Sequence, residues 1–336
     1  MAKEQRRGRK IAMDKAELDA FLAGERTCRV ATALYRTEGC ACRGVTESPS
    51  QVRESLYFLN KNIILTVSED SLGQQAEVLP SILDLLDLEY VEENLYRSCA
   101  VYRDEYRLFG GQVAAQALYA AGRTVPDGRL PHSLHGYFLR QGATVRPTLF
   151  RVERDRDGQS FSARRVVAVQ DGEVIFNMAA SFTAARPGVD ADAEPGPELT
   201  APDLLPSWIN PRHTSFECRS AQQERRLPGQ FWIRCTAELP DDPMLHAAIL
   251  AYVSDISNGL VPLEGADMRS GPSLDHAVWF HRPARMDDWT WQDLIPHTAA
   301  AGRGLYTGAI FSRDGARVAS IAQEVLFRRK PGREAQ

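Results

Sequence analysis

The sequence predicts an α+β fold built from two similar units, in each of which an antiparallel sheet wraps a long helix. Two matches indicate the duplication. Tyr137–Arg140 corresponds to Trp279–Arg282 at an offset of 142, and Asp171-Gly172 corresponds to Asp314-Gly315 at an offset of 143. In each unit an apolar helical segment precedes the first match and strand-like segments follow it. This shared order favours duplication over chance.

Each predicted helix has signals at its ends. Gly110-Gly111 precedes the Ala- and Leu-rich segment from Gln112 to Gly122, and a glycine there can end a helix. Asp241-Asp242-Pro243 opens the second helix, because acidic residues suit the positive end of a helix and proline suits its first turn.

The strands show a period of two, as the segment 173–184 illustrates. Its alternate apolar residues would share one face: Val174, Phe176, Met178, Ala180 and Phe182. The two Asp-Gly pairs lie between strand segments, where hairpin turns occur. Composition then divides the chain into an N-terminal extension (1–76), a first unit (77–184), a Pro-rich linker (185–230) and a second unit (231–330).

Overall composition excludes several classes. The 336 residues carry a net charge of -4, which gives no strong field for nucleic acid. The longest apolar stretch, about Ala247–Val253, is too short for a membrane span. Six scattered cysteines form neither a disulfide scaffold nor a complete zinc site. We therefore expect a cytoplasmic protein with reduced thiols and no metal.

Standard nucleophile and cofactor motifs are absent from the sequence. It contains no G-x-S-x-G, H-E-x-x-H, P-loop or G-x-G-x-x-G motif. This speaks against an α/β-hydrolase, a zincin, a P-loop NTPase and a Rossmann enzyme.

Two polar residues break the local pattern, and such positions are often functional. Asp255 lies near a helix C-terminus, where its charge opposes the helix dipole. A structural role in capping the turn at Ser257–Gly259 is the slightly better interpretation of this residue alone. Gln323 lies on an otherwise apolar strand face, where a buried amide must find partners. The matching position in the first unit is Ala180, so the fold does not require a polar group there, which favours function.

A third polar region is the segment Ser273–Pro283. Its His276 and His281 could each be a general base or a metal ligand. Lone histidines in such segments are more often structural, and no recognised metal-ligand spacing is present.

Several motifs in this order resemble the type II acyl-CoA thioesterases over roughly residues 81–328. The segments that carry the resemblance are Phe109–Gln112, His132–Arg140, Asp157–Arg165 and Asp275–Pro283. The resemblance implies a double hotdog fold, with two hotdog domains in one chain. It also implies hydrolysis of acyl-CoA to a free fatty acid and coenzyme A.

The family's catalytic residues can be matched one by one. Asp255 falls in a Y-x-S-D motif, Ser273 lies two residues before an Asp-His pair, and Gln323 lies in a Gln-Glu pair on the last strand. The resemblance implies that these three orient one water for attack on the thioester, without an acyl-enzyme. His135, in an H-S-x-H motif, is a secondary candidate for which a structural hydrogen bond is favoured.

The resemblance further implies an acyl-CoA partner, no cofactor, and a homo-oligomer, either a dimer or a tetramer. Helix N-terminal N–H groups would hold the oxyanion. The candidates for substrate binding are Gly110, Gly111, Gln112, Arg165 and Arg328. Arg164 and Arg165 point to opposite strand faces, so at most one of them reaches a given ligand.

The N-terminal extension resembles a truncated split-barrel flavin-binding segment of the pyridoxamine phosphate oxidase type. Glu17–Leu22 and Arg26–Thr32 carry this resemblance. We expect a helix beginning at Ile11, a strand at Thr27–Leu34 and a hairpin from Ser55–Phe58 and Ile63–Thr66. About 70 residues cannot close such a barrel, so we expect no bound flavin.

Two other functions stay open at this stage. A hotdog enoyl-CoA hydratase would need an Asp/His pair after a helix start, and the histidines of the first unit are not so arranged. A non-catalytic acyl-CoA sensor would have no use for the set of Asp255, Ser273 and Gln323. Neither reading involves nucleic acid or a membrane span.

Overall fold

The computed structural model describes residues 9–11, 65–67, 79–103, 107–193, 196–210, 212–224, 227–265 and 268–329. The chain forms two compact units, 1–78 and 79–336. In the first, strand β1 (Arg9–Ile11) pairs antiparallel with β2 (Leu65–Val67). Ile11 is therefore in a strand and does not begin a helix. The strand expected at 27–34 and the segment 55–58 lie outside the described residues.

The second unit contains three α-helices in its described ranges: α3 (Ile82–Leu86), α4 (Gly110–Gly122) and α5 (Pro243–Val253). Short 3-10 helices occupy Pro202–Leu204 and Val261–Leu263. The expected start of α5 is confirmed, because Asp242 caps it by accepting from the N–H groups of Met244 and Leu245. The N-cap of α4, Phe109, makes no side-chain cap.

The strands of this second unit form one antiparallel sheet. They are β3 (Leu88–Glu92), β4 (Leu95–Ser98), β5 (Arg129–Phe138), β6 (Leu149–Asp157), β7 (Phe161–Gln170), β8 (Glu173–Ala184), β9 (Phe216–Arg219), β10 (Gln230–Cys235), β11 (Met268–Ser273), β12 (Asp275–Phe280), β13 (Thr290–Ala300), β14 (Arg303–Ser312) and β15 (Arg317–Arg329). Their order is β3-β4-β6-β7-β8-β5-β12-β15-β14-β13-β10-β9, and β11 also pairs with β15.

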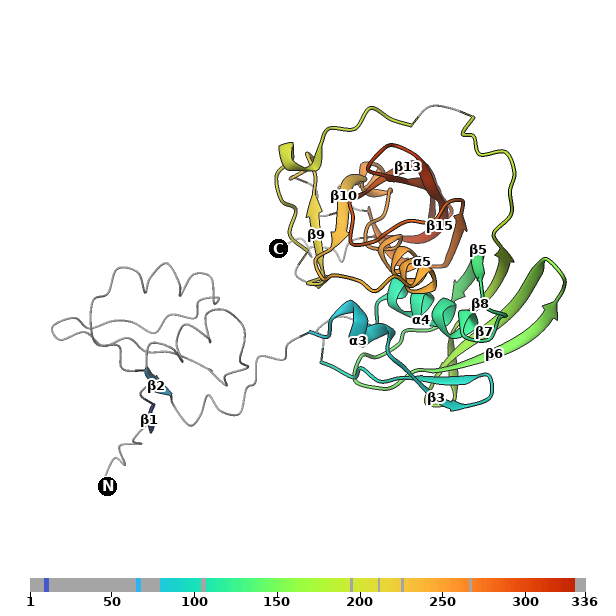
Figure 1. Cartoon of the computed structure of the whole chain (residues 1–336). Coiled ribbons are helices and arrows are strands. Elements are labelled where there is room, and N and C mark those ends of the chain that lie inside the picture. The colour runs from blue at the N-terminus through green and yellow to red at the C-terminus, as the bar shows by residue number, and fades with distance from the viewer. Residues whose placement is uncertain are drawn as a thin grey trace, which may run out of the picture. The chain divides into compact units, whose positions relative to one another are not determined.

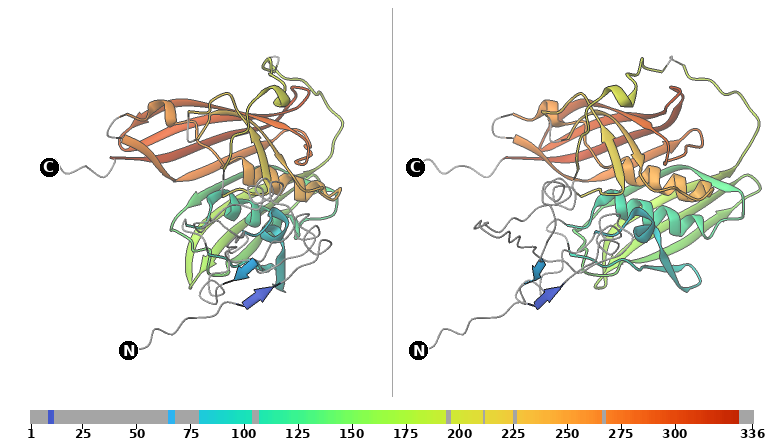
Figure 2. Two further views of the ribbon diagram at one scale, coloured as in Figure 1. Left: turned by 90° about the vertical axis from the view of Figure 1, so that its left-hand side faces the viewer. Right: turned by 60° about the vertical axis from the view of Figure 1, so that its left-hand side comes forward.

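The sheet has two halves with the same strand order. Outward from the centre, the first half runs β5-β8-β7-β6 and the second runs β12-β15-β14-β13. Asp171-Gly172 turns β7 into β8, and Gly315, with a φ of 87°, lies in the turn between β14 and β15. The central strands β5 and β12 pair with each other, so the two expected sheets are joined edge to edge (Figures 1 and 2).

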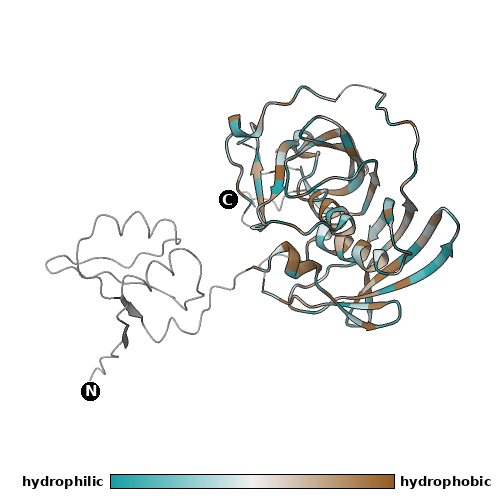
Figure 3. Cartoon of the chain, viewed as in Figure 1, coloured by the Kyte–Doolittle hydropathy of each residue, from teal (hydrophilic) through white to brown (hydrophobic). Residues whose placement is uncertain are grey.

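Helices α4 and α5 lie side by side, α4 against the first half of the sheet and α5 beside the second (Figure 1). Both are buried around most of their circumference, as Ala114, Leu118, Ala248 and Ile249 illustrate with full burial. Hydrophobic residues concentrate on α5, whereas α4 mixes apolar residues with glycine and glutamine, and hydrophobic and polar residues alternate along the strands (Figure 3). The core therefore lies between the helix pair and the inner faces of the sheet.

The expected linker at 185–230 contains more structure than its composition indicates. Strand β9 lies within it and pairs with β10, and Trp208 and Cys218 are buried. A four-residue strand is too short to show a clear period of two, which explains why the sequence did not reveal it. No helix in the described ranges combines the length and the apolar character needed to cross a bilayer.

Candidate functional site

The end of α5 and the strands β11 and β15 bring Asp255, Ser273 and Gln323 together. Asp255 follows the helix by two residues, Ser273 ends β11, and Gln323 lies on the neighbouring β15. The Nε2 of Gln323 donates to Asp255 Oδ1 over 2.8 Å and also to Ser273 Oγ. Both hydrogens of this buried amide are thus committed to the other two members of the predicted set.

The other side of the Gln323 amide is held by two fully buried residues. Tyr306 OH, on β14, donates to Gln323 Oε1 over 2.9 Å, and His276 Nδ1, on β12, also contacts Oε1. All four hydrogen-bonding positions of the amide are therefore filled. Sequence reasoning missed Tyr306, because a tyrosine on an alternating strand resembles an ordinary core residue.

The N-terminus of α4 faces the Asp255 carboxylate. A backbone N–H from Gly111 bonds to Asp255. A methyl group on Gly110 would lie only 2.7 Å from Asp255 Oδ2, so glycine is needed for this close approach. The positive end of the helix dipole stabilises a carboxylate at this place. The first half of the sheet thus supplies a helix end to a site whose side chains come from the second half.

Burial sets the protonation of the groups around Gln323. It raises the pKa of Asp255 above its ordinary value, against the opposing effects of His276, the Gln323 bond and the Gly111 bond. Burial lowers the pKa of His276 and raises that of Tyr306 well above its usual range. His276 is accordingly neutral and Tyr306 keeps its proton. No cluster of three or more metal-ligating side chains occurs within the described part of the chain.

A cavity of about 960 Å³ opens onto Asp255, Ser273 and Gln323. Part of its wall is apolar and comes from both halves: Val113, Phe138, Ile175, Phe176, Ile256 and Val325. Four arginines also line it: Arg107, Arg140, Arg212 and Arg269. Sequence reasoning missed these arginines, because they come from irregular segments and strand ends that only the tertiary fold brings together.

The other predicted site residues lie elsewhere. His135 is exposed on β5 and packs edge-on against Trp279, with ring centroids 5.0 Å apart. Gln112 is buried and accepts from Tyr102 OH over 2.8 Å. Arg165 is exposed and forms ion pairs with carboxylates on β6, and Arg328 is exposed outside the cavity lining. Of the substrate-binding candidates, only Gly110 lines the cavity.

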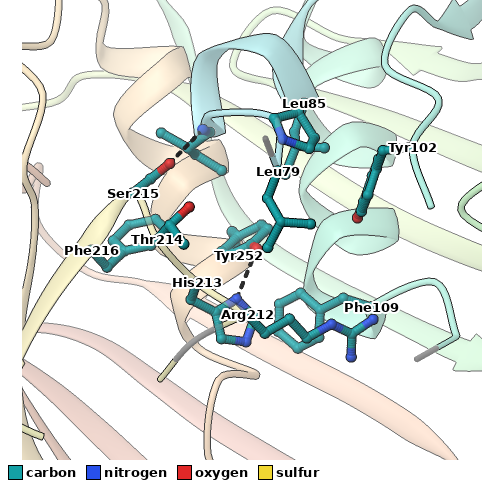
Figure 4. A pocket seen from close by; sticks show the side chains of 12 residues that line it. Leu79, Leu85, Tyr102, Phe109, Arg212, His213, Thr214, Ser215, Phe216 and Tyr252 are labelled. Carbon is teal, nitrogen blue, oxygen red and sulfur yellow. Dashed lines mark hydrogen bonds between the residues drawn. The ribbon is translucent and has the colours of Figure 1, made fainter. Parts of the chain in front are cut away.

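An aromatic cluster packs against the start of α4 (Figure 4). The ring of Phe109 packs edge-on against both His213 and Tyr252, with centroids 4.6 and 4.9 Å away. His213 Nδ1 and Tyr252 OH are 2.9 Å apart. Burial lowers the pKa of His213 to about 3, so the ring is neutral. The Tyr252 carbonyl lies against Gly111, which couples this cluster to the helix end that faces Asp255.

Comparison with known families gives two adjacent matches. Residues 103–183 match the description "Acyl-CoA thioesterase N-terminal domain", and residues 184–327 match "Acyl-CoA thioesterase C-terminal domain". The boundary at residue 183 falls at the end of β8, where the first half of the sheet is complete.

Two curated relatives match over most of their own length. The chain is 32% identical to acyl-CoA thioesterase 2 of Haemophilus influenzae, over 75% of this chain and 99% of that protein. It is 34% identical to acyl-coenzyme A thioesterase 8 of Homo sapiens, over 74% of this chain and 89% of that protein.

Solved structures are also similar to this chain. An acyl-CoA thioesterase II from Mycobacterium marinum has a TM-score of 0.65 and 42% identity, covering 75% of this chain and all of that one. A protein described as having the hot dog fold, from Alicyclobacillus acidocaldarius, has a TM-score of 0.61 at 22% identity over 76% of this chain and all of that one. The expected double hotdog fold is confirmed.

Proposed function

Because the chain belongs to the type II acyl-CoA thioesterase family, we propose that it hydrolyses acyl-CoA thioesters to a free acid and coenzyme A. The observation that carries the proposal is the hydrogen-bonded set of Asp255, Gln323 and Ser273 at the wall of a large cavity. A carboxylate, an amide and a hydroxyl in this arrangement can hold a water molecule next to a bound thioester.

In the proposed reaction Gln323 is an anchor, since its amide hydrogens are occupied by Asp255 and Ser273. Asp255 and the Ser273 hydroxyl hold the water. Asp255 takes a proton as the water oxygen attacks the thioester carbonyl carbon. The C–S bond then breaks, and the proton passes to the departing thiolate of coenzyme A. The reaction uses only substrate and water.

The start of α4 supports stabilisation of the oxyanion. Its N-cap, Phe109, provides no side-chain acceptor, and the helix begins with Gly110 in the cavity wall. Backbone N–H groups at a helix N-terminus are effective donors to developing negative charge. We assign the oxyanion site to this first turn, apart from the Gly111 N–H, which bonds to Asp255, and place it beside the water held by Asp255.

The cavity lining supports an acyl-CoA substrate. Its apolar residues suit an acyl chain, and guanidinium groups suit the phosphates of coenzyme A. We assign phosphate binding to Arg107, Arg212 and Arg269. Arg140 is left out because its guanidinium pairs with the Glu173 carboxylate over 2.9 Å. Arg212 is included, although it also donates to the Arg107 carbonyl oxygen and lies over the Phe109 ring.

Two accompanying assignments are also proposals. Cys99, Cys218 and Cys235 are free thiols, which supports a reducing compartment such as the cytoplasm. Assembly into a dimer or tetramer stays a prediction.

The test is thiol release from short-, medium- and long-chain acyl-CoAs by the wild type and by Asp255→Asn. We expect release by the wild type and a loss of about 10²- to 10⁴-fold in kcat in the variant, with acyl-CoA binding retained. Asp293→Asn, a carboxylate outside the cavity, is the matched control and keeps full activity. Binding without release by the wild type would make the protein an acyl-CoA-binding module and overturn the proposal.

A second arm tests the phosphate assignment. Arg269→Ala should raise KM for acyl-CoA by about tenfold, because charged hydrogen bonds of this kind contribute about 1.5–3 kcal/mol. KM for the same acyl group on a small thiol without phosphates should stay unchanged. An equal rise for both substrates would assign Arg269 to the acyl part of the site.

A further inference from the structure

The His276 side chain is fully buried in the second half of the sheet and is outside the cavity lining. Its Nε2 lies 2.7 Å from Ser254 Oγ, at the end of α5, and its Nδ1 contacts Gln323 Oε1. It therefore bridges the helix end that carries Asp255 and the strand that carries Gln323. Nothing in the proposed reaction so far uses it.

The hydrogen bonds determine which ring nitrogen carries the proton. The carbonyl oxygen of Gln323 can only accept, so the hydrogen of the neutral ring must lie on Nδ1. Nε2 then accepts from the Ser254 hydroxyl, whose single hydrogen is shared with the Ala251 carbonyl oxygen 2.8 Å away. The result is a directed chain from Ser254 through His276 to Gln323, and from Gln323 to Asp255 and Ser273.

The orientation of the amide is set by Asp255, independently of the histidine. The Asp255 carboxylate can only accept, so the NH₂ group of Gln323 faces it and Oε1 faces Tyr306 OH and His276 Nδ1. If the amide turned over, its oxygen would face the Asp255 carboxylate. Asp255 thus fixes the amide, and the amide oxygen then requires a hydrogen on Nδ1 of His276.

We propose that His276 is a positioning residue for thioester hydrolysis: as the Nδ1–H tautomer it donates to the Gln323 amide, which in turn holds Asp255 and Ser273 around the water. The inference rests on the proposed function and adds a residue to its site. His276 touches neither substrate nor water, so its whole effect passes through Gln323.

The test is a double-mutant cycle of His276→Leu and Gln323→Ala, measured by steady-state thiol release. Leucine fits the framework, because Leu134 occupies the corresponding place in the first half of the sheet. His276→Leu should lower kcat by about 10- to 100-fold, the usual cost of losing a partner that orients a site residue, with KM changed less than about twofold. In the Gln323→Ala background it should have no further effect.

Two variants complete the experiment. His276→Asn places an amide N–H near the position of Nδ1 and should recover part of the lost kcat. His297→Leu removes an exposed histidine from β13, outside the cavity lining, and should leave kcat unchanged.

Three outcomes are decisive. Wild-type kcat in His276→Leu, or losses that multiply in the double variant, would overturn the positioning role while leaving the proposed function intact. Full activity of Gln323→Ala would contradict the proposed water mechanism, and the positioning role with it.

Discussion

In the first half of the sheet Leu134 on β5 pairs with Ala180 on β8, and both are buried. At the corresponding place in the second half, His276 on β12 contacts Gln323 on β15. The same frame of strands therefore holds an apolar pair in one half and a polar network in the other. Since the backbone tolerates both, the chemistry resides in a few side chains placed on a duplicated fold.

The charged groups near the ends of the two central helices differ in the same way. Thr124 and Asp255 each lie two residues beyond the end of the central helix of their half. In the first half Thr124 accepts from the buried Arg164, whose guanidinium also binds Asp157 over 2.8 Å. Arg164 is surrounded by acceptors, which suits a structural role. Asp255 instead faces a cavity, which suits a reaction.

The largest effects are expected when Gln323 and Ala180, which occupy matching positions in the two halves, are each replaced by the other's residue. Gln323→Ala introduces the residue of the first half and should lower kcat by about 10²-fold or more, because Asp255 and Ser273 lose their shared anchor. Ala180→Gln buries an amide opposite Leu134 and should cost about 1–3 kcal/mol in the free energy of unfolding, with kcat unchanged. Thiol release and chemical denaturation measure the two effects. A large loss of kcat in Ala180→Gln would show that the halves do not divide function in this way.

Removing the buried Arg164 and the partly buried Asp255 should affect stability in opposite directions. Arg164→Leu leaves the hydroxyl and carbonyl oxygens of Thr124 without their buried donor and should lower the free energy of unfolding by about 1–3 kcal/mol, while the folded fraction keeps its kcat. Asp157 adds little, because it is exposed and still accepts from Ser162. For Asp255 the raised pKa means that folding favours the protonated carboxyl. The stability this contributes is present at low pH and is lost as pH rises through the folded-state pKa. Asp255→Asn should therefore increase stability at neutral pH. Denaturation of both variants at pH 7 gives the signs, and a destabilised Asp255→Asn would contradict the burial argument.

The sequence predicted the parts of the fold and site that show up as local patterns. Asp255 and Gln323 stood out because each is a polar group where the surrounding pattern is apolar, and Ser273 was found only through the family motif. The period of two separated Arg164 from Arg165 correctly, since one is buried and the other exposed. Contacts between distant elements left no such pattern. The pairing of β5 with β12 and the partners of Tyr306 depend on tertiary packing.

Gly110 and Gly122, at the two ends of α4, should differ less strongly in their effect on kcat. Alanine is favoured over glycine in helices by about 1 kcal/mol, so space decides the outcome at each position. A methyl group at Gly110 would press on Asp255 Oδ2 and the ring of Phe138, whereas one at Gly122 would meet the flexible side chain of Met244. Gly110→Ala should lower kcat by about tenfold through displacement of the carboxylate, and Gly122→Ala should leave kcat unchanged. Equal kcat values for the two variants would mean that Asp255 tolerates the displacement.

The smallest predicted effect that distinguishes the two halves is in the pH dependence of kcat/KM. Asp255 has a titratable carboxyl group, and Thr124, at the matching place in the first half, has none. Burial raises the pKa of Asp255 above its usual value of 3.8, while the Gln323 bond, the Gly111 N–H, His276 and Arg212 oppose the shift. Since the carboxylate must be ionised to take a proton, kcat/KM should fall with decreasing pH at a midpoint above 3.8. Removing the Gln323 bond favours the protonated carboxyl, so the residual activity of Gln323→Ala should show this midpoint at higher pH. A midpoint that stays unmoved in Gln323→Ala would assign the acid limb to a group that Gln323 does not contact, and Asp255 would then lose its role as the base.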